Sequence, residues 1–265
     1  MIATVRTGAV NGIEGFGVTV EIDLARGLPS FTIVGLPNAA VRESRERVAA
    51  AIRNNGFDFP KKRITVNLAP ADVRKEGAAF DLPIAVGVLM ASGQLDAGGA
   101  ERLVLLGELA LDGTLKRVRG ALPVACHARD EGYRGLIVPE ESAGEAALVG
   151  GIAVMPCRDL AEAVRLLRGG EARPAPRLEE RRAPAHAHLD YAQVRGQESA
   201  KRALEIAAAG GHHLLMVGPP GSGKTMLARR IVTILPPLGG EEALENAKIR
   251  SVSGGPVDFR FERPF

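Results

Sequence analysis

Apolar and polar residues alternate along three segments near the start of the chain. These segments, IATVRTGAV, FGVTVEIDL and SFTIVGLP, are separated by the turn-forming stretches NGIEG and ARGLP. A period of two is typical of half-buried strands, and short turns between strands favour antiparallel pairing. We therefore predict a meander of antiparallel strands over residues 2–37.

A helical period follows these strands. Asn38 is a favourable N-cap, Val41, Val48 and Ile52 recur at roughly helical spacing, and Gly56 marks the end. The segment is predicted to be a helix with one apolar face.

The charges of the same segment form two i,i+4 pairs, Arg42 with Glu46 and Glu43 with Arg47. Such pairs are typical of a solvated helix face. A row of arginines facing DNA is the alternative interpretation.

The pattern continues with a mixture of strands and helices. Residues 63–70 read as a strand, residues 80–93 as a largely buried helix, and residues 102–116 as a β-hairpin that turns at Asp112-Gly113. From 121 to 169, runs of helical length alternate with short apolar runs, which predicts parallel βαβ units.

A linker is predicted at residues 169–189, where proline and charge accumulate and no periodicity is visible. His186 and His188 lie in this stretch. With no cysteine or third histidine nearby, they are interpreted as solvated linker residues rather than metal ligands.

A phosphate-binding loop, GPPGSGKT, follows the linker. An amphipathic helix is predicted at 190–211, a short buried strand at 212–218 and a helix at 224–235, so the loop has the strand-loop-helix context that such a motif requires. The predicted nucleotide-binding residues are Gly218, Pro219, Pro220, Gly221, Ser222, Gly223, Lys224 and Thr225.

The chemistry of this loop assigns a task to each position. Its three glycines let backbone N–H groups point at phosphate oxygens, which a Cβ would obstruct. Lys224 would bridge the β- and γ-phosphates of ATP, and the Thr225 hydroxyl would bind the Mg²⁺ that accompanies them.

Hydrolysis needs more than the loop. A carboxylate at the end of another strand and an arginine from a neighbouring subunit normally complete the site. The residues after Thr225 contain no apolar strand that ends in acidic residues, and Glu241 and Glu242 read as the start of a helix. We expect this chain to bind ATP without turning it over.

Composition narrows the class of protein. Hydrophobic residues make up 46% and charged residues 25%, and no long apolar run or leader is visible, so we expect a cytoplasmic protein without membrane contact. Cys126 and Cys157 are expected to be buried thiols. The net charge of +3 permits nucleic acid as a partner, but aromatic residues, at 4%, are too few for a base-stacking platform.

Three long segments, RGLPSFTIVGLPNAAVRESRERV, KRITVNLAPADVRKEGAAFDLPIAVGVL and VRGQESAKRALEIAAAGGHHLLMVGPPGSGKT, resemble the YifB/ComM family, which is related to the ATPase subunit of magnesium chelatase. The resemblance implies an α+β or α/β chain with a Lon-protease-like domain at 1–168, the linker at 169–189 and the beginning of an AAA+ domain at 190–265. It also implies a hexameric, ATP-driven DNA motor for branch migration in natural transformation, and it indicates that this chain is an N-terminal fragment. Gly196 and Gln197 match the family signature that precedes the adenine site.

The same resemblance separates two functions. Lon uses a Ser-Lys dyad, and the matching positions here are Ala79 and Leu122, so neither nucleophile nor base is present. Lys75 and Lys116 are nearby in sequence but do not match. An ATP-dependent Lon-type peptidase, for which Ser92 is a possible nucleophile, and a chelatase-like subunit for metal insertion are the alternatives to the DNA motor.

Overall fold

The computed structural model describes residues 2–96, 98–176, 189–255, 257, 261 and 263. The chain divides into two compact units. Unit 1 contains residues 1–178 and 247–257, and unit 2 contains residues 179–246 and 258–265. Each unit is described by itself.

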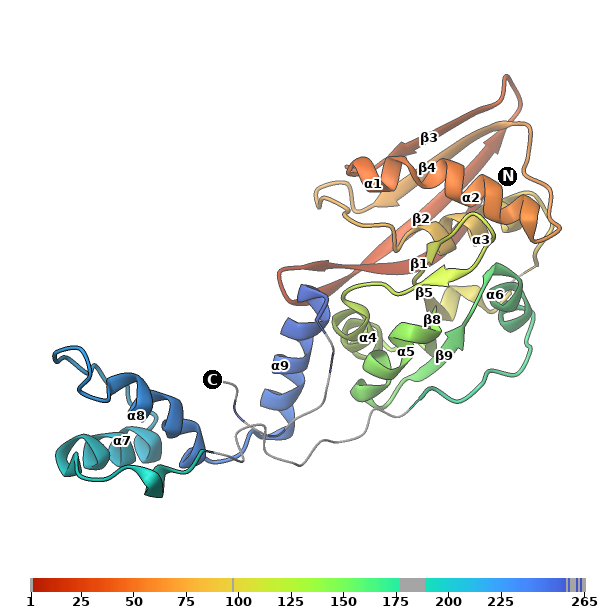
Figure 1. The fold of residues 1–265 in the computed structure, drawn as a ribbon. Coiled ribbons are helices and arrows are strands. Elements are labelled where there is room, and N and C mark those ends of the chain that lie inside the picture. Colours follow the sequence, from red (N-terminus) through yellow and green to blue (C-terminus); the bar gives the residue numbers. More distant parts are fainter. Residues whose placement is uncertain are drawn as a thin grey trace. The chain divides into compact units, whose positions relative to one another are not determined.

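Unit 1 is built on a seven-stranded sheet with the order β3-β4-β2-β1-β5-β8-β9 (Figure 1). Strand β2 runs antiparallel to both of its neighbours, and every other neighbouring pair is parallel. The strands are β1 (Ile2–Asn11), β2 (Glu14–Ala25), β3 (Ser30–Val34), β4 (Arg63–Ala69), β5 (Leu103–Leu105), β8 (Gly135–Pro139) and β9 (Ala153–Cys157). The predicted mixture of strands and helices is therefore confirmed.

The predicted meander is correct for β1 and β2 and wrong for β3. Strands β1 and β2 form a long antiparallel hairpin, whereas β3 pairs in parallel with β4. Two helices, α1 (Ala39–Arg42) and α2 (Ser44–Asn54), connect β3 to β4. A helical crossover brings the chain back to the starting edge of the sheet, so the strands it joins run in the same direction. Asn38 caps α1 as predicted, because its Oδ1 accepts a hydrogen bond from the Val41 N–H at 3.0 Å.

Helices cover both faces of this sheet, and the two-residue period of the strands separates the two cores. Leu105 of β5 and Ile137 of β8 belong to one core. Leu136 and Val138, which flank Ile137 in β8, belong to the other. The first core packs against α2, α3 (Asp81–Ala91) and α6 (Leu160–Leu167), and the second against α4 (Ala121–Asp130) and α5 (Glu140–Ala146). The predicted alternation of parallel strands and helices after residue 121 is confirmed.

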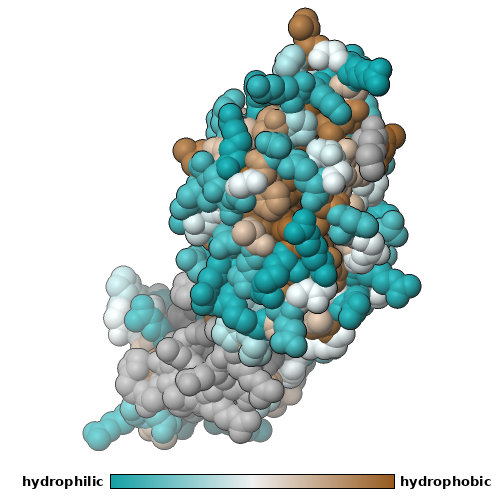
Figure 2. All heavy atoms as spheres, turned by 90° about the vertical axis from the view of Figure 1, so that its right-hand side faces the viewer, coloured by the Kyte–Doolittle hydropathy of each residue, from teal (hydrophilic) through white to brown (hydrophobic). Residues whose placement is uncertain are grey.

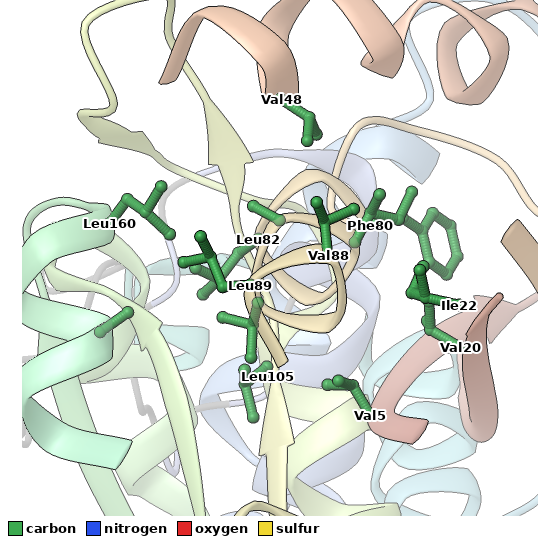
Figure 3. Close-up of a cluster of buried hydrophobic side chains, with 14 of the residues drawn as sticks. Val5, Val20, Ile22, Val48, Phe80, Leu82, Val88, Leu89, Leu105 and Leu160 are labelled. Atoms are coloured by element: carbon green, nitrogen blue, oxygen red, sulfur yellow. The ribbon is translucent and has the colours of Figure 1, made fainter. Parts of the chain in front are cut away.

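Helix α3 is the centre of the first core. Leu82 and Leu89 project from it toward side chains that come from the strands and from the neighbouring helices (Figure 3). Nearly every residue of α3 is buried, which confirms the helix predicted over 80–93. An apolar helix of this kind is stable only when elements surround it on several sides.

Helix α4 approaches the β1–β2 hairpin closely because two glycines leave room for it. A Cβ on Gly15 would overlap the carbonyl of Pro123, and a Cβ on Gly8 would overlap the side chain of Val124. Close contact between a helix and a strand requires small residues on the strand. These positions therefore fix where α4 begins relative to the sheet.

The predicted hairpin over 102–116 is shorter than expected. Its first part is β5, which joins the main sheet, and only β6 (Glu108–Leu109) and β7 (Leu115–Lys116) pair as a hairpin. Asp112-Gly113 lies in the turn, as predicted, and Gly113 has φ +89°. The pattern did not distinguish these two roles because a buried parallel strand and a hairpin arm are both short and apolar.

The i,i+4 charge pairs predicted over residues 42–47 do not form, and the single helix expected there is divided at Glu43 into α1 and α2. Arg47 instead reaches the buried Asp81 at the start of α3, and Glu46 lies 3.6 Å from Arg45. A buried carboxylate attracts a guanidinium more strongly than an exposed partner does, because water screens it less. The prediction of a solvated face is therefore wrong for Arg47.

The first residues of the predicted linker pack onto unit 1. Arg173 binds Glu140 at 2.8 Å and Glu162 at 3.0 Å. His186 and His188 lie outside the described residues. Cys126 and Cys157 are free and buried, as expected.

The described residues of unit 2 form helices joined by irregular segments. It contains α7 (Glu198–Gly210) and α8 (Lys224–Arg230), with 3₁₀ turns at Tyr191–Gln193 and Ile231–Thr233. Helix α9 (Gly240–Ser253) begins in unit 2 with Glu241 and Glu242 in its first turn, which confirms that they start a helix, and its residues from Ala247 onward belong to unit 1.

The strand predicted at 212–218 is wrong. No residue between 189 and 246 is in a strand, and Leu215 and Val217 are 86% and 87% exposed. A parallel strand needs neighbours on both sides for its backbone groups and helices over both faces for its side chains. The described part of unit 2 supplies neither.

Candidate nucleotide-binding site and the cleft of unit 1

The phosphate loop connects the irregular segment 212–219 to helix α8. Gly221 and Gly223 have φ of +81° and +85°, a backbone conformation that other residues rarely adopt. A Cβ on Gly218 would lie 3.2 Å from Ser222 Oγ, closer than most such contacts. The backbone conformation of the loop therefore favours glycine at positions 221 and 223.

The Lys224 side chain is hydrogen-bonded to earlier residues of the loop. Its Nζ donates to the carbonyl oxygens of Gly218 and Pro219, both at 2.8 Å, and to Ser222 Oγ at 3.1 Å. These three acceptors hold the ammonium group over the loop. Phosphate oxygens could replace them, because an ammonium group binds an anion more strongly than it binds neutral acceptors.

Gln197, which belongs to the family signature, is hydrogen-bonded to the phosphate loop 25 residues later in the chain. Its Nε2 donates to the Ser222 carbonyl at 3.3 Å. Gln197 has φ +60° and Gly196 has φ +65°, so both residues lie in the left-handed region immediately before α7. The structure thus places Gly196 and Gln197 beside the phosphate loop.

A small apolar cluster holds α7 and α8 together. Val194, Leu204 and Leu227 are its buried members. Polar contacts reinforce it, because Arg230 donates to the Asp190 carbonyl at 3.1 Å and to Gln193 Oε1 at 2.9 Å. The loop therefore continues directly into α8, and α8 packs against α7.

The loop fits the phosphates of a nucleotide. Its glycines leave the space that a Cβ would fill, and the first N–H groups of α8 have no acceptor within the helix. Thr225 is exposed, which leaves its hydroxyl accessible to a metal ion. The described residues contain no cluster of three or more His, Cys, Asp or Glu side chains that could hold a metal by themselves.

Unit 1 has a cavity of about 440 Å³ beside Ala79, the position that the family resemblance matches to the nucleophile of Lon. Ala79 lines it, together with glycines and apolar residues of β1 and α4 and with Glu76, Glu108, Arg117 and Arg119. No Ser, Thr, Cys, Lys or His side chain is among its described lining residues. Leu122, at the other dyad position, is fully buried in α4 and does not line the cavity.

The nearby residues that could have replaced the dyad lie elsewhere. Lys75 is buried, its Nζ donates to the Pro70 carbonyl, and burial lowers the pKa of its ammonium group. Lys116 is exposed on β7, and Ser92 Oγ donates to the Leu89 carbonyl at the end of α3. The cavity therefore holds neither a nucleophile nor a base for the Ser-Lys chemistry of a Lon peptidase.

Two buried carboxylates near this cavity were not singled out from the sequence. Arg47 holds Asp81 through Nε and Nη2 at 2.6 and 3.0 Å, while burial raises the pKa of Asp81 to about 6. Burial likewise raises the pKa of Glu145 to about 7, although Arg117 lies 3.6 Å away. An acidic residue inside an otherwise apolar run is the signal that could have identified each of them.

Two protein-family models match separate parts of this chain. A family model described as subunit ChlI of Mg-chelatase matches residues 20–142, and one described as magnesium chelatase, subunit ChlI, matches residues 190–265. The chain is 47% identical to the uncharacterized protein YifB of Salmonella typhimurium over 266 residues, which are 100% of this chain. It is 44% identical to the competence protein ComM of Haemophilus influenzae over 270 residues.

The chain belongs to the YifB/ComM family. It covers 52% of the Salmonella protein, 53% of the Haemophilus protein and 49% of the YifB protein of Escherichia coli, to which it is 47% identical. It therefore spans about half the length of the curated relatives it matches.

Within this YifB/ComM chain, the two family matches fall on the two candidate sites. The first match includes Ala79 and Leu122, and the second includes the phosphate loop. None of the described helices combines the length and the apolar content that crossing a bilayer requires.

Proposed function

We propose that this chain is the nucleotide-binding part of an ATP-driven AAA+ motor that acts on DNA in recombination or natural transformation. The family membership and the competence relative support this proposal. The observation that carries the ATP-binding part is the arrangement of Lys224, whose ammonium group is held over a glycine-rich loop at the start of a helix.

Each residue of the loop has a role in this proposal. The glycines allow backbone N–H groups to surround phosphate oxygens, and Lys224 exchanges its carbonyl partners for the terminal phosphates. Thr225 supplies a hydroxyl ligand for Mg²⁺, and Gln197 keeps the loop in place through Ser222. Bound Mg·ATP would supply the phosphoryl group and the energy for movement along DNA, and subunits assembled in a ring, of which a hexamer is the expected form, would share that work.

The first test measures ATP binding to the 265-residue chain by calorimetric titration. Lys224→Ala removes the motif's side-chain cation, and a hydrogen bond to a charged group contributes about 1.5–3 kcal/mol, so we expect affinity to fall about 100-fold. Arg202→Ala is the matched control, since Arg202 is an exposed cation on α7 that pairs only with the exposed Glu205. Equal affinities for wild type and Lys224→Ala would contradict the proposal.

The motor activity is tested by ATP hydrolysis. We expect turnover only in a chain extended to the length of the curated relatives, with stimulation by branched DNA, because no carboxylate at the end of a strand is present among residues 189–246. Hydrolysis by the 265-residue chain alone would show that one of its own carboxylates completes the site.

A further inference from the structure

The amino ends of the parallel strands in unit 1 carry a basic groove of about 190 Å³. The groove lies between the start of β3, helix α2 and the segment before β4. Its lining carries four cations and a single carboxylate, Glu46; the cations are Arg45, Arg53, Lys61 and Lys62. We call the groove with these four cations the basic groove.

Two further cations border the groove. Arg63 pairs in register with Ala25 on one side and with Ser30 on the other, which brings the segment before β4 next to the β2–β3 connection. Arg26 lies in that connection, and both Arg26 and Arg63 are exposed. The positive charge thus continues across several strand ends instead of stopping at the groove.

Three of the four groove cations lack an acidic partner among the described residues, whereas Arg45 lies 3.6 Å from Glu46. Lys61 and Lys62 form no ion pair within the described part of the chain, and Arg53 donates only to the Ala49 carbonyl. Several other surface arginines in unit 1 are paired, as Arg158 is with Glu140 and Arg165 is with Glu162. Unpaired like charges placed side by side repel one another, and an anionic ligand removes this repulsion.

The size of the groove limits the ligand. A volume of about 190 Å³ corresponds to roughly six water molecules at about 30 Å³ each, so a large ligand lies across the groove instead of entering it. Phe31 and Phe59 contribute half-buried rings to the lining, with centroids 6.3 Å apart, which gives the groove an apolar floor beneath its charged rim. A polymer that repeats a phosphate along its length satisfies several of these cations at once.

We propose that the basic groove and its bordering arginines bind the phosphodiester backbone of DNA without reading its sequence. The proposal deepens the DNA-acting half of the proposed function by giving unit 1 a part in it. The proposed DNA binding needs no ATP, because every residue that it uses lies in unit 1 and the phosphate loop lies in unit 2.

The experiment measures binding of a fluorescent single strand and of a fluorescent duplex to the 265-residue chain, by anisotropy, without ATP and at several salt concentrations. Each phosphate contact contributes about 0.9 to the slope of log affinity against log salt for a duplex and about 0.7 for a single strand. Lys61→Ala/Lys62→Ala should therefore lower the duplex slope by about 1.8 and the affinity at 0.1 M salt by roughly 50-fold. Lys61→Arg/Lys62→Arg should retain binding, since the charges remain.

The matched control is Arg74→Ala/Lys116→Ala, which removes two exposed cations outside the groove: Arg74 follows β4 and lies 3.4 Å from Glu76, and Lys116 lies on β7. We expect this control to change affinity less than twofold. Equal losses in the two alanine pairs, unchanged binding by Lys61→Ala/Lys62→Ala, or no DNA binding by the wild type would overturn the proposal.

Competition identifies the class of ligand. Polyglutamate at the same charge concentration should displace DNA poorly, and equally good displacement would replace DNA with an acidic protein as the partner. The DNA-binding measurement contains no ATP, and the ATP titration contains no DNA. Failure of the ATP-binding proposal and failure of the groove proposal are therefore distinguishable.

Discussion

Similar apolar pentapeptides fold differently in the two units. In unit 1, residues 135–139 (GLIVP) form β8, which is buried and hydrogen-bonded to β5 on one side and β9 on the other. In unit 2, residues 213–217 (HLLMV) form no strand, and most of their side chains are exposed. Both segments have the composition of a central strand, so the neighbouring strands decide which of them becomes one.

The phosphate loop shows the opposite behaviour. Its shape follows from its own residues, because Gly221 and Gly223 supply the positive φ angles and Lys224 bonds to carbonyls only five and six positions away. Local interactions of this kind do not require a completed sheet. A site can therefore keep its geometry while the strand that normally leads into it does not form.

The largest expected contrast is in amide hydrogen exchange. Amides of Val86 and Val88 in α3 should exchange at least about 1,000-fold more slowly than those of Leu215 and Val217, because exchange in a buried core needs unfolding that costs several kcal/mol. In a chain extended to the length of the relatives, the amides of Leu215 and Val217 should become protected as neighbouring strands form. Strong protection of these two amides in the 265-residue chain would contradict the importance that we give to neighbouring strands.

The same contrast explains what could be predicted from the sequence. The period of two identified β1, β2, β3 and β4, and the helical period identified α2, α3 and α6, since each pattern depends on residues within one element. Pairing of β3 with β4 and the entry of β5 into the main sheet could not be read from these periods. They depend on contacts between segments that are far apart in the chain.

The residues of the candidate sites also differ in how far they could be predicted from the sequence. Gly218 through Thr225 were recognisable because a short motif carries the geometry, and Gln197 was suggested only by resemblance to a family. The ion pair between Arg47 and Asp81 was missed, because Glu43 offered Arg47 a partner nearer in sequence and only burial made Asp81 the stronger one.

Arg47→Ala is expected to have the next largest effect. Asp81 is fully buried, and removing its partner leaves an uncompensated carboxylate, which costs about 3–5 kcal/mol unless the carboxylate takes up a proton. Chemical denaturation followed by far-ultraviolet circular dichroism measures the change. Arg230→Ala, which removes an arginine that anchors a turn of unit 2, should leave the main transition unchanged. Equal destabilisation by the two substitutions would indicate that the units unfold together.

Arg158→Ala provides the control within unit 1. The Arg158 and Glu140 side chains are 65% and 43% exposed, and exposed pairs contribute at most about 1 kcal/mol. A loss as large as that of Arg47→Ala would show that burial does not determine the strength of these pairs.

The most gradual expected effect is on the pH dependence of stability. Burial raises the pKa of Glu145 from 4.5 to about 7, so between these values the folded chain holds a proton that the unfolded chain has released. The stabilisation is therefore complete below pH 4.5 and is lost as the pH rises toward 7, with a slope of at most about 1.4 kcal/mol per pH unit.

Glu145→Gln should flatten this decline between about pH 6 and 7, because glutamine keeps the shape of the protonated side chain and does not titrate. Below about pH 6 a decline should remain, because burial also raises the pKa of Asp81 to about 6. Glu242 in unit 2 is the matched carboxylate, since its pKa is lowered by the Gly239 N–H and by Arg263 and it lies at the surface. Glu242→Gln should leave the pH profile of the main transition as it is in the wild type. Flattening of the profile by Glu242→Gln and not by Glu145→Gln would contradict this prediction. The titrating group would then belong to unit 2, and Glu145 would have to be ionised already at the lower pH.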